Sequence, residues 1–157
     1  MKIQVICMGK TQHSALRQWL PEYTQRLAHY CKFEWTELPE LKNTKNLRQE
    51  IQKEEEGKVL LKQLIPSDIV VLFDEKGVSH TSKDFAVFLQ KRMNAGTKNL
   101  VFVIGGPFGF SAQLYQRAQY KISLSAMTFS HQMVRIFVAE QLYRAFSILK
   151  NEPYHHE

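Results

Sequence analysis

Strand-like runs rich in valine, isoleucine and phenylalanine recur five times along the 157-residue chain, and each is followed by a segment with helical spacing. The runs cover residues 2–7, 33–37, 68–73, 99–104 and 120–124. Residues 69–73 and 100–104 are apolar without alternation, which is typical of parallel strands covered by helices on both faces. The pattern therefore predicts a three-layer α/β fold with a mostly parallel sheet between two helical layers. Because no repeat, linker or break in composition divides the chain, residues 1–157 are expected to form a single domain.

Apolar stripes with helical period mark three of the helices. The first stripe runs through residues 16–30, where Pro21 is expected to kink the helix or to begin a new first turn. The second follows a capping signal at residues 81–84 and stops at Gly96. The last stripe extends over residues 131–149 and predicts a long C-terminal helix.

Charge is distributed unevenly. The 21 lysines and arginines outnumber the 15 acidic residues, yet no acid occurs between Asp84 and Glu140. This basic window favours contact with nucleic acid, although basic proteins also keep such surfaces for solubility alone. The acids at residues 50–56 are interspersed with lysines, as on an exposed helix face.

The cysteines and the apolar runs point to a location inside the cell. Cys7 and Cys31 are too few for a disulfide framework or a metal cluster, and neither belongs to a C-x-x-C pair. No secretory leader and no apolar stretch near 18 residues occurs. We therefore expect a cytoplasmic protein with no membrane partner.

Three segments follow strands at the edge where open parallel sheets bind their ligands: residues 72–77, 105–109 and 123–128. The glycines of the second segment allow the backbone to approach a ligand, and a plain turn is the alternative. The third segment interleaves hydroxyl and apolar residues before a helix, so its backbone is suited to an adenine edge, or its hydroxyls to capping that helix.

Several familiar chemistries do not fit these segments. A dinucleotide fingerprint is disfavoured because Ile104 replaces its first glycine and no acid follows before Glu140. No Gly-Lys-Ser/Thr sequence follows the glycines, which excludes a P-loop. No nucleophile elbow surrounds Ser123 or Ser125.

The end of the chain carries further polar candidates. Glu140 and Arg144 have the i, i+4 spacing of an ion pair, which is usually a surface pair without function. His155 carries an imidazole, a side chain suited to proton transfer, although short C-terminal tails are usually frayed. His155 and His156 are adjacent and point apart, which argues against a shared metal ion.

The second half of the chain combines motifs that resemble one family. They are VIGGPFG at 103–109, SLSAMT at 123–128, His131 with Arg135, EQLYRA at 140–145, and PYH at 153–155. The chain resembles, over essentially its whole length, the RlmH (YbeA) family of SPOUT-class methyltransferases, which methylate N3 of a pseudouridine in bacterial 23S rRNA. The resemblance implies a homodimer whose C-terminal part forms a deep trefoil knot, which strand-order rules alone argue against.

The resemblance also implies roles for individual residues. The cofactor S-adenosylmethionine is expected against ten residues on three loops: Leu72, Phe73, Gly105, Gly106, Leu124, Ser125, Ala126, Met127, Thr128 and Phe129. Arg144 is expected to stabilise charge on a base carbonyl or to bind phosphate, with Glu140 orienting it. The partner subunit's tail is expected to bring Tyr154 and His155 to the target base, where His155 assists loss of the N3 proton or orients the imide.

The expected substrate is the large-subunit rRNA within the assembled ribosome, and no metal ion is required. Contact with the RNA is expected from four basic residues: Arg117, Lys121, His131 and Arg135. Two alternatives stay open, a SPOUT enzyme with another RNA target such as a tRNA, and a non-catalytic ribosome-assembly factor. A dehydrogenase is a more distant third.

Overall fold

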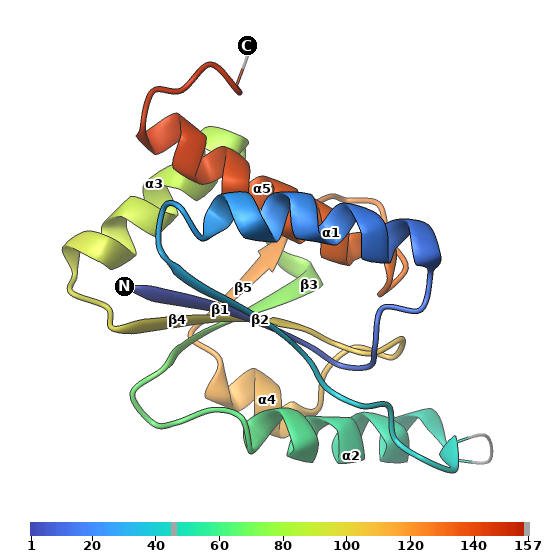
Figure 1. The fold of residues 1–157 in the computed structure, drawn as a ribbon. Coiled ribbons are helices and arrows are strands. Elements are labelled where there is room, and N and C mark those ends of the chain that lie inside the picture. The colour runs from blue at the N-terminus through green and yellow to red at the C-terminus, as the bar shows by residue number, and fades with distance from the viewer. Residues whose placement is uncertain (45–46, 156–157) are drawn as a thin grey trace.

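The computed structural model describes residues 1–44 and 47–155, which form a parallel sheet between two layers of helices (Figure 1). The strands are β1 (Lys2–Cys7), β2 (Lys32–Glu37), β3 (Ile69–Ser79), β4 (Asn99–Ile104) and β5 (Tyr120–Ser123). They pair in the order β2-β1-β4-β3-β5, and every pair is parallel. The predicted three-layer α/β fold is confirmed. Of the two adjacent histidines near the C-terminus, His156 lies outside the described residues.

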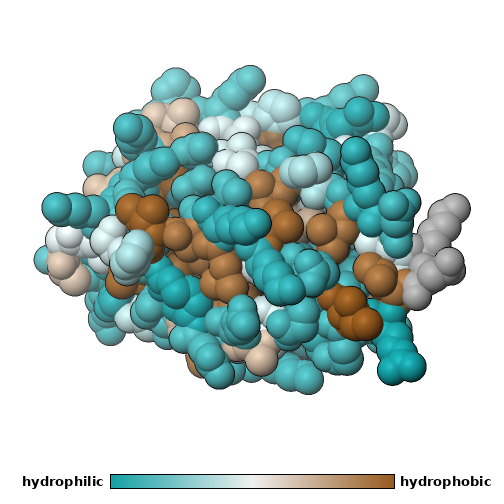
Figure 2. Space-filling view, turned by 90° about the horizontal axis from the view of Figure 1, so that it is seen from below, coloured by the Kyte–Doolittle hydropathy of each residue, from teal (hydrophilic) through white to brown (hydrophobic). Residues whose placement is uncertain are grey.

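Within the described residues, five helices cover the two faces of the sheet. Helices α1 (Ser14–Leu27), α3 (Ser82–Asn94) and α5 (Met133–Leu149) lie on one face, and α2 (Gln49–Leu61) and α4 (Ala112–Arg117) lie on the other (Figure 1). The face covered by α2 and α4 is mostly hydrophilic on the outside, with apolar side chains exposed between the charged ones (Figure 2). Within the part of the chain that is described, no helix is long and apolar enough to cross a membrane.

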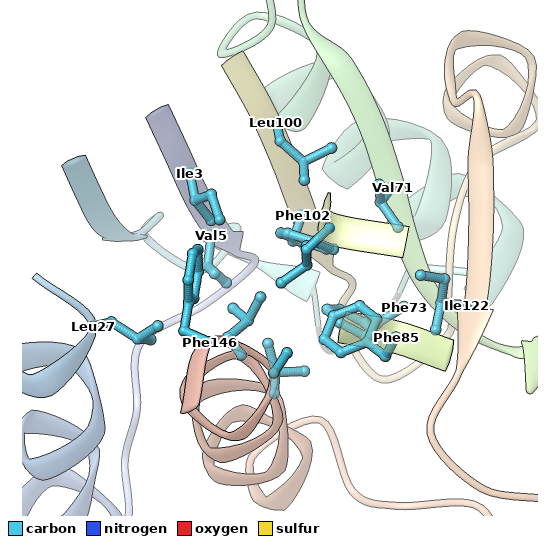
Figure 3. Packing of buried hydrophobic residues seen from close by; sticks show 14 of the residues in the cluster. Ile3, Val5, Leu27, Val71, Phe73, Phe85, Leu100, Phe102, Ile122 and Phe146 are labelled. Carbon is cyan, nitrogen blue, oxygen red and sulfur yellow. The ribbon is translucent and has the colours of Figure 1, made fainter. Parts of the chain in front are cut away.

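The core is divided by the two-residue period of the strands, because alternate side chains point to opposite faces. Val5, Phe73 and Phe102 face α1, α3 and α5, where they pack with Leu27, Phe85 and Phe146 (Figure 3). The intervening residues, such as Leu72 and Val103, face α2 and α4. Each fully buried side chain of this kind contributes roughly 1.5–3 kcal/mol relative to exposure, so burial on both faces stabilises the sheet.

The predicted helix signals are largely confirmed. Thr81 caps α3 by accepting a hydrogen bond from the Asp84 backbone N–H at 3.1 Å, and Gly96 follows the helix with a φ of +71°. Pro21 lies inside α1, which continues through it. Trp19 departs from the predicted stripe, since 62% of it is exposed.

Strand β3 extends six residues beyond the predicted end and shapes the ligand edge of the sheet. A register shift between Phe73 and Val78 allows β3 to pair with β5 a second time, through Val78 and Ser79. Gly77 makes this possible, because a Cβ at that position would lie 2.6 Å from the backbone of Ile122. The extended, irregular end of β3 therefore forms a wall beside the carboxyl end of β5.

Candidate cofactor cavity and C-terminal cluster

A cavity of about 550 Å³ opens at the carboxyl edge of the sheet, between the segments that follow β3, β4 and β5. This volume lies in the range of small-molecule sites. The cavity is lined by eight of the ten residues expected to bind the cofactor: Phe73, Gly105, Gly106, Leu124, Ser125, Met127, Thr128 and Phe129. Leu72 and Ala126 are not among the lining residues, and the Leu72 side chain points to the opposite face, into the core beneath α2 and α4.

The loop after β4 is held in a tight turn that presents main chain to the cavity. Gly109 has a φ of +82°, and its N–H donates to the Gly106 carbonyl at 3.2 Å. A Cβ at Gly105 would lie 3.0 Å from the Phe110 ring and 3.1 Å from the Gly109 oxygen, so this position has no room for a larger residue. Of the two alternatives for this loop, its position in the cavity wall favours a ligand loop.

The loop after β5 uses its hydroxyl groups to hold its own shape. The Ser123 hydroxyl donates to the Ser125 carbonyl at 2.8 Å, and the Ser125 hydroxyl accepts from the Met127 N–H at 2.9 Å. The N-cap of α5 is Gln132, which makes no side-chain cap bond, while the Ser130 hydroxyl accepts from the Met133 N–H at 3.2 Å. The hydroxyl groups of this segment therefore hold the cavity loop and meet the first residue of α5.

His131 lies at the cavity rather than on an outer RNA-facing surface. Burial lowers the pKa of its imidazole, and the nearby Arg135 charge lowers it further, while Glu40 acts in the opposite direction. The ring is therefore neutral at neutral pH. A neutral ring in this wall avoids repulsion of a cationic ligand.

Arg135 is completely buried, so the prediction that it contacts RNA is wrong. Its guanidinium donates to the carbonyls of Met8 and Gly9 at 2.9 and 3.1 Å and to the Thr11 hydroxyl at 2.9 Å. Its Nε donates to the His131 carbonyl at 3.1 Å, and Glu37 lies 3.5 Å away as counterion. Arg135 therefore ties the segment after β1 to the end of the cavity loop.

The C-terminal tail folds against the last turns of α5. Arg144 donates from Nε to Glu140 Oε1 at 2.9 Å, and its guanidinium carbon lies 4.8 Å from the centre of the Tyr154 ring. The Tyr154 hydroxyl donates to Glu140 Oε1 at 3.2 Å, and Arg144 Nη1 lies 3.5 Å from His155 Nδ1. The structure thus brings the four predicted catalytic residues into one cluster, which we call the C-terminal cluster.

The surroundings of this cluster determine the protonation states of Arg144 and Tyr154. The hydrogen bond that Arg144 donates to Glu140 raises the pKa of Arg144 above its ordinary value. Burial raises the pKa of the Tyr154 phenol, and the Glu140 charge raises it further. Tyr154 is therefore a neutral hydrogen-bond donor and Arg144 a permanent cation throughout the physiological pH range.

Three tyrosines support the tail, which the sequence did not indicate: Tyr23 of α1, Tyr30 just after α1, and Tyr143 of α5. The Tyr30 hydroxyl donates to Glu152 Oε2, Tyr23 contributes to the raised pKa of Tyr154, and the Tyr143 ring packs edge-on against Tyr154 at 4.6 Å. The helical stripe assigned Tyr23 and Tyr30 to the core. Because the tail follows α1 by more than 120 residues, only the tertiary fold reveals this contact.

Within a single chain, the C-terminal cluster lies away from the cavity. Val134 lines the cavity near the start of α5, and Arg144 follows ten residues later, about 15 Å along the helix axis. In Figure 1 the tail leaves the end of α5 that lies away from the loop between β5 and α5. The two halves of the predicted site are therefore separate within a single subunit.

The remaining predicted RNA contacts differ from each other. Arg117 is half-buried and donates to the carbonyls of Ile65 and Asp68 at 2.7 and 3.0 Å, at the edge of the sheet opposite the cavity. Lys121 is exposed, and its ammonium lies 5.6 Å from the centre of the ring of Tyr115, a cavity residue. Only Lys121 of this pair presents its charge beside the cavity.

Among residues 1–44 and 47–155, no group of three or more histidines, cysteines and acids is arranged to hold a metal ion.

Comparison with known proteins agrees with this geometry. The profile of the family described as "Predicted SPOUT methyltransferase" matches residues 1–155, and the chain therefore belongs to the SPOUT methyltransferases. A solved structure of a probable methylase family protein from Haemophilus influenzae has a similar fold, with a TM-score of 0.54 at 12% identity over 99% of this chain and 70% of that chain.

Full-length relatives narrow the assignment within this class. The chain is 56% identical to the ribosomal RNA large subunit methyltransferase H of Christiangramia forsetii, over 99% of both chains. It is 53% identical to the protein of the same name from Flavobacterium johnsoniae, over 100% of both chains. The resemblance of the motifs to this group of enzymes is thereby confirmed.

Proposed function

We propose that residues 1–157 act as a single-domain, S-adenosylmethionine-dependent methyltransferase that methylates N3 of a pseudouridine in 23S rRNA. The enzyme would act on the assembled ribosome in the cytoplasm, as a homodimer with a knotted C-terminal half. The observation that carries the proposal is the cavity of about 550 Å³ formed by the three strand ends, in a chain 56% identical to a large-subunit rRNA methyltransferase.

The cavity suits the cofactor in size and in the residues of its wall. Main-chain groups of Gly105 and Gly106, of residues 124–125 and of residues 127–129 would hold the nucleoside, because these residues line the cavity without bulky polar side chains. When bound, S-adenosylmethionine supplies an electrophilic methyl group on a sulfonium. The neutral imidazole of His131 adds no positive charge to the wall, where Glu50, Asp74 and Glu75 accompany Lys53 and Lys76.

The chain's own residues would orient the base and handle its proton. Transfer would break the sulfur–methyl bond, form a bond to N3 and release the N3 proton, so the base would develop negative charge before or during attack. Arg144, fixed by Glu140, would stabilise charge on a base carbonyl. His155 would accept the N3 proton or hold the imide, while Tyr154 keeps the tail against Arg144.

The separation of the C-terminal cluster from the cavity supports a dimer. Apolar side chains of Met127, Phe129, Met133 and Phe137 are 39–76% exposed beside the cavity, and Phe129 packs on Phe137 at 4.8 Å. Met133 and Phe137 share one face of α5 with Arg144, since they lie eleven and seven residues before it. A second copy packed on this face would cover the apolar patch and bring its own tail toward the cavity.

The decisive experiment is mass spectrometry of 23S rRNA from a strain that lacks the gene. We expect one N3-methylpseudouridine to disappear and to return when the wild-type gene is supplied. Persistence of the modification would overturn the substrate assignment. Methylation of tRNA but not of ribosomes by the purified protein would support the alternative RNA target, and absence of cofactor binding would support an assembly factor.

A further inference from the structure

Glu56 is a buried carboxylate in a helix whose other acids reach solvent. The sequence placed it on an exposed face of residues 50–56, but only 4% of it is exposed. Its Oε1 accepts a hydrogen bond from Gln52 Nε2 at 2.8 Å. Its Oε2 is buried and has no hydrogen-bond partner among the described residues. Such a group is costly to bury and calls for a functional explanation.

The carboxyl group lies directly behind the glycine loop of the cavity. A Cβ at Gly106 would lie 2.3 Å from Glu56 Oε2 and 2.9 Å from its Cδ. The next residue, Gly57, is packed equally closely on Ser111, since a Cβ there would lie 2.2 Å from the Ser111 hydroxyl oxygen. Because Gly106 lines the cavity and Glu56 does not, the main chain of one residue separates the carboxyl group from the cavity.

Among the described residues, no ion pair joins Glu56 to a cation. Burial raises the pKa of the Glu56 carboxyl, the hydrogen bond from Gln52 lowers it, and the neighbouring charge of Glu40 raises it. Lys53 and Lys76 line the cavity beside acidic residues, and Lys53 pairs with Glu50 at 2.9 Å, while Arg135 pairs with Glu37. A positive ligand bound in the cavity would therefore add a compensating charge for Glu56, acting through a medium of low dielectric.

We propose that Glu56 is a specificity-determining residue that makes the cavity prefer the positively charged S-adenosylmethionine over its neutral product, S-adenosylhomocysteine. The two molecules differ by one methyl group and one positive charge, so main-chain contacts alone distinguish them poorly. After transfer the charge leaves the cavity, the buried carboxylate loses its counterion, and product release is favoured. The inference rests on the proposed function for the identity of the cofactor.

Calorimetric titration of the purified full-length protein with each of the two compounds tests the proposal. For the wild-type protein we expect tighter binding of S-adenosylmethionine than of S-adenosylhomocysteine. Glu56→Gln keeps the size of the side chain and removes its charge, and we expect it to weaken S-adenosylmethionine binding by about tenfold or more, equivalent to about 1.4 kcal/mol. Its affinity for S-adenosylhomocysteine should be unchanged, and Glu56→Asp should retain most of the preference.

Glu55→Gln is the matched control, because Glu55 precedes Glu56 on the same helix but pairs with Lys58 at the surface. It should change neither affinity. Equal weakening of both ligands by Glu56→Gln would show that Glu56 only supports the loop, and would overturn the proposal. Equal or tighter binding of S-adenosylhomocysteine by the wild-type protein would overturn it without any variant. Failure of the wild-type protein to bind either compound would instead overturn the proposed function.

Discussion

Arg135 and Arg144 lie nine residues apart on α5, and their surroundings assign them opposite tasks. Arg135 is completely buried and donates to three carbonyls and one hydroxyl, with Glu37 as counterion. Arg144 is half-buried, pairs with Glu140 and lies over the Tyr154 ring, with Nη1 near His155. A guanidinium whose donors all bond within the fold is structural. A guanidinium that is bonded through only some of its donors can still bind a substrate with the others.

The partners of the two arginines explain this difference. Most partners of Arg135 lie far away in the sequence: Met8, Gly9 and Thr11 precede it by more than 120 residues and Glu37 by 98, so it joins distant parts of the chain. The partners of Arg144 are the preceding turn of α5 and the tail. Removing the first should therefore damage the fold, and removing the second should damage the reaction.

The largest effect is expected from Arg135→Met. The substitution leaves the Met8 and Gly9 carbonyls and Glu37 without their buried donor, which should lower the free energy of unfolding by about 3–5 kcal/mol. Denaturant unfolding followed by circular dichroism measures this. The matched variant Arg144→Met should cost less than half as much. Equal losses from the two variants would remove the distinction between the two arginines.

The next effect is expected from Arg144→Lys. Lysine keeps the charge but not the planar fork that pairs with Glu140 and stacks on Tyr154. Single-turnover methylation of ribosomes should fall by about 10²–10³-fold, as for loss of a donor that stabilises developing charge. Thermal unfolding and S-adenosylmethionine affinity should be close to those of the wild-type protein. A rate within a few-fold of wild type would exclude Arg144 from the chemistry.

The sequence predicted the strands and the ligand edge well, because hydrophobic periodicity and glycine placement are local signals. The predicted starts of β1, β4 and β5 agree with the structure, and the glycine loop lies where the end of β4 predicted it. The predicted exposure of Arg135 and Glu56 was wrong, because the burial of a polar side chain depends on partners far away in the chain. Helical spacing alone does not show that Arg135 is buried, and no local signal indicates its hydrogen bonds to carbonyls in the loop after β1.

A smaller effect on rate is expected from His155→Ala. His155 lies beside Arg144 in the C-terminal cluster, so its loss should slow single-turnover methylation by about 10²-fold at neutral pH, the lower end for a general acid–base group. Measuring the rate over a range of pH separates proton transfer from positioning, because a lost base also removes a limb of the pH profile. An unchanged rate at every pH would remove His155 from the mechanism.

The smallest effect should distinguish Lys121 from Arg117. It tests, within the basic window, whether a cation that bonds to carbonyls of the fold is structural and an exposed cation is free to bind RNA. Lys121 is exposed beside the cavity residue Tyr115, while Arg117 donates to two carbonyls at the opposite edge of the sheet. If Lys121 meets an rRNA phosphate, Lys121→Ala should reduce the slope of log affinity against log salt by about one, with a uniform loss of ribosome binding. Arg117→Ala should leave that slope unchanged and lower the free energy of unfolding instead, because it leaves the carbonyls of Ile65 and Asp68 without this donor.

Filter binding to ribosomes at several salt concentrations, with unfolding curves for both variants, measures the salt slope and the stability together. A change of slope for Arg117→Ala, or none for Lys121→Ala, would show that internal hydrogen bonding does not decide which cations of this protein reach RNA.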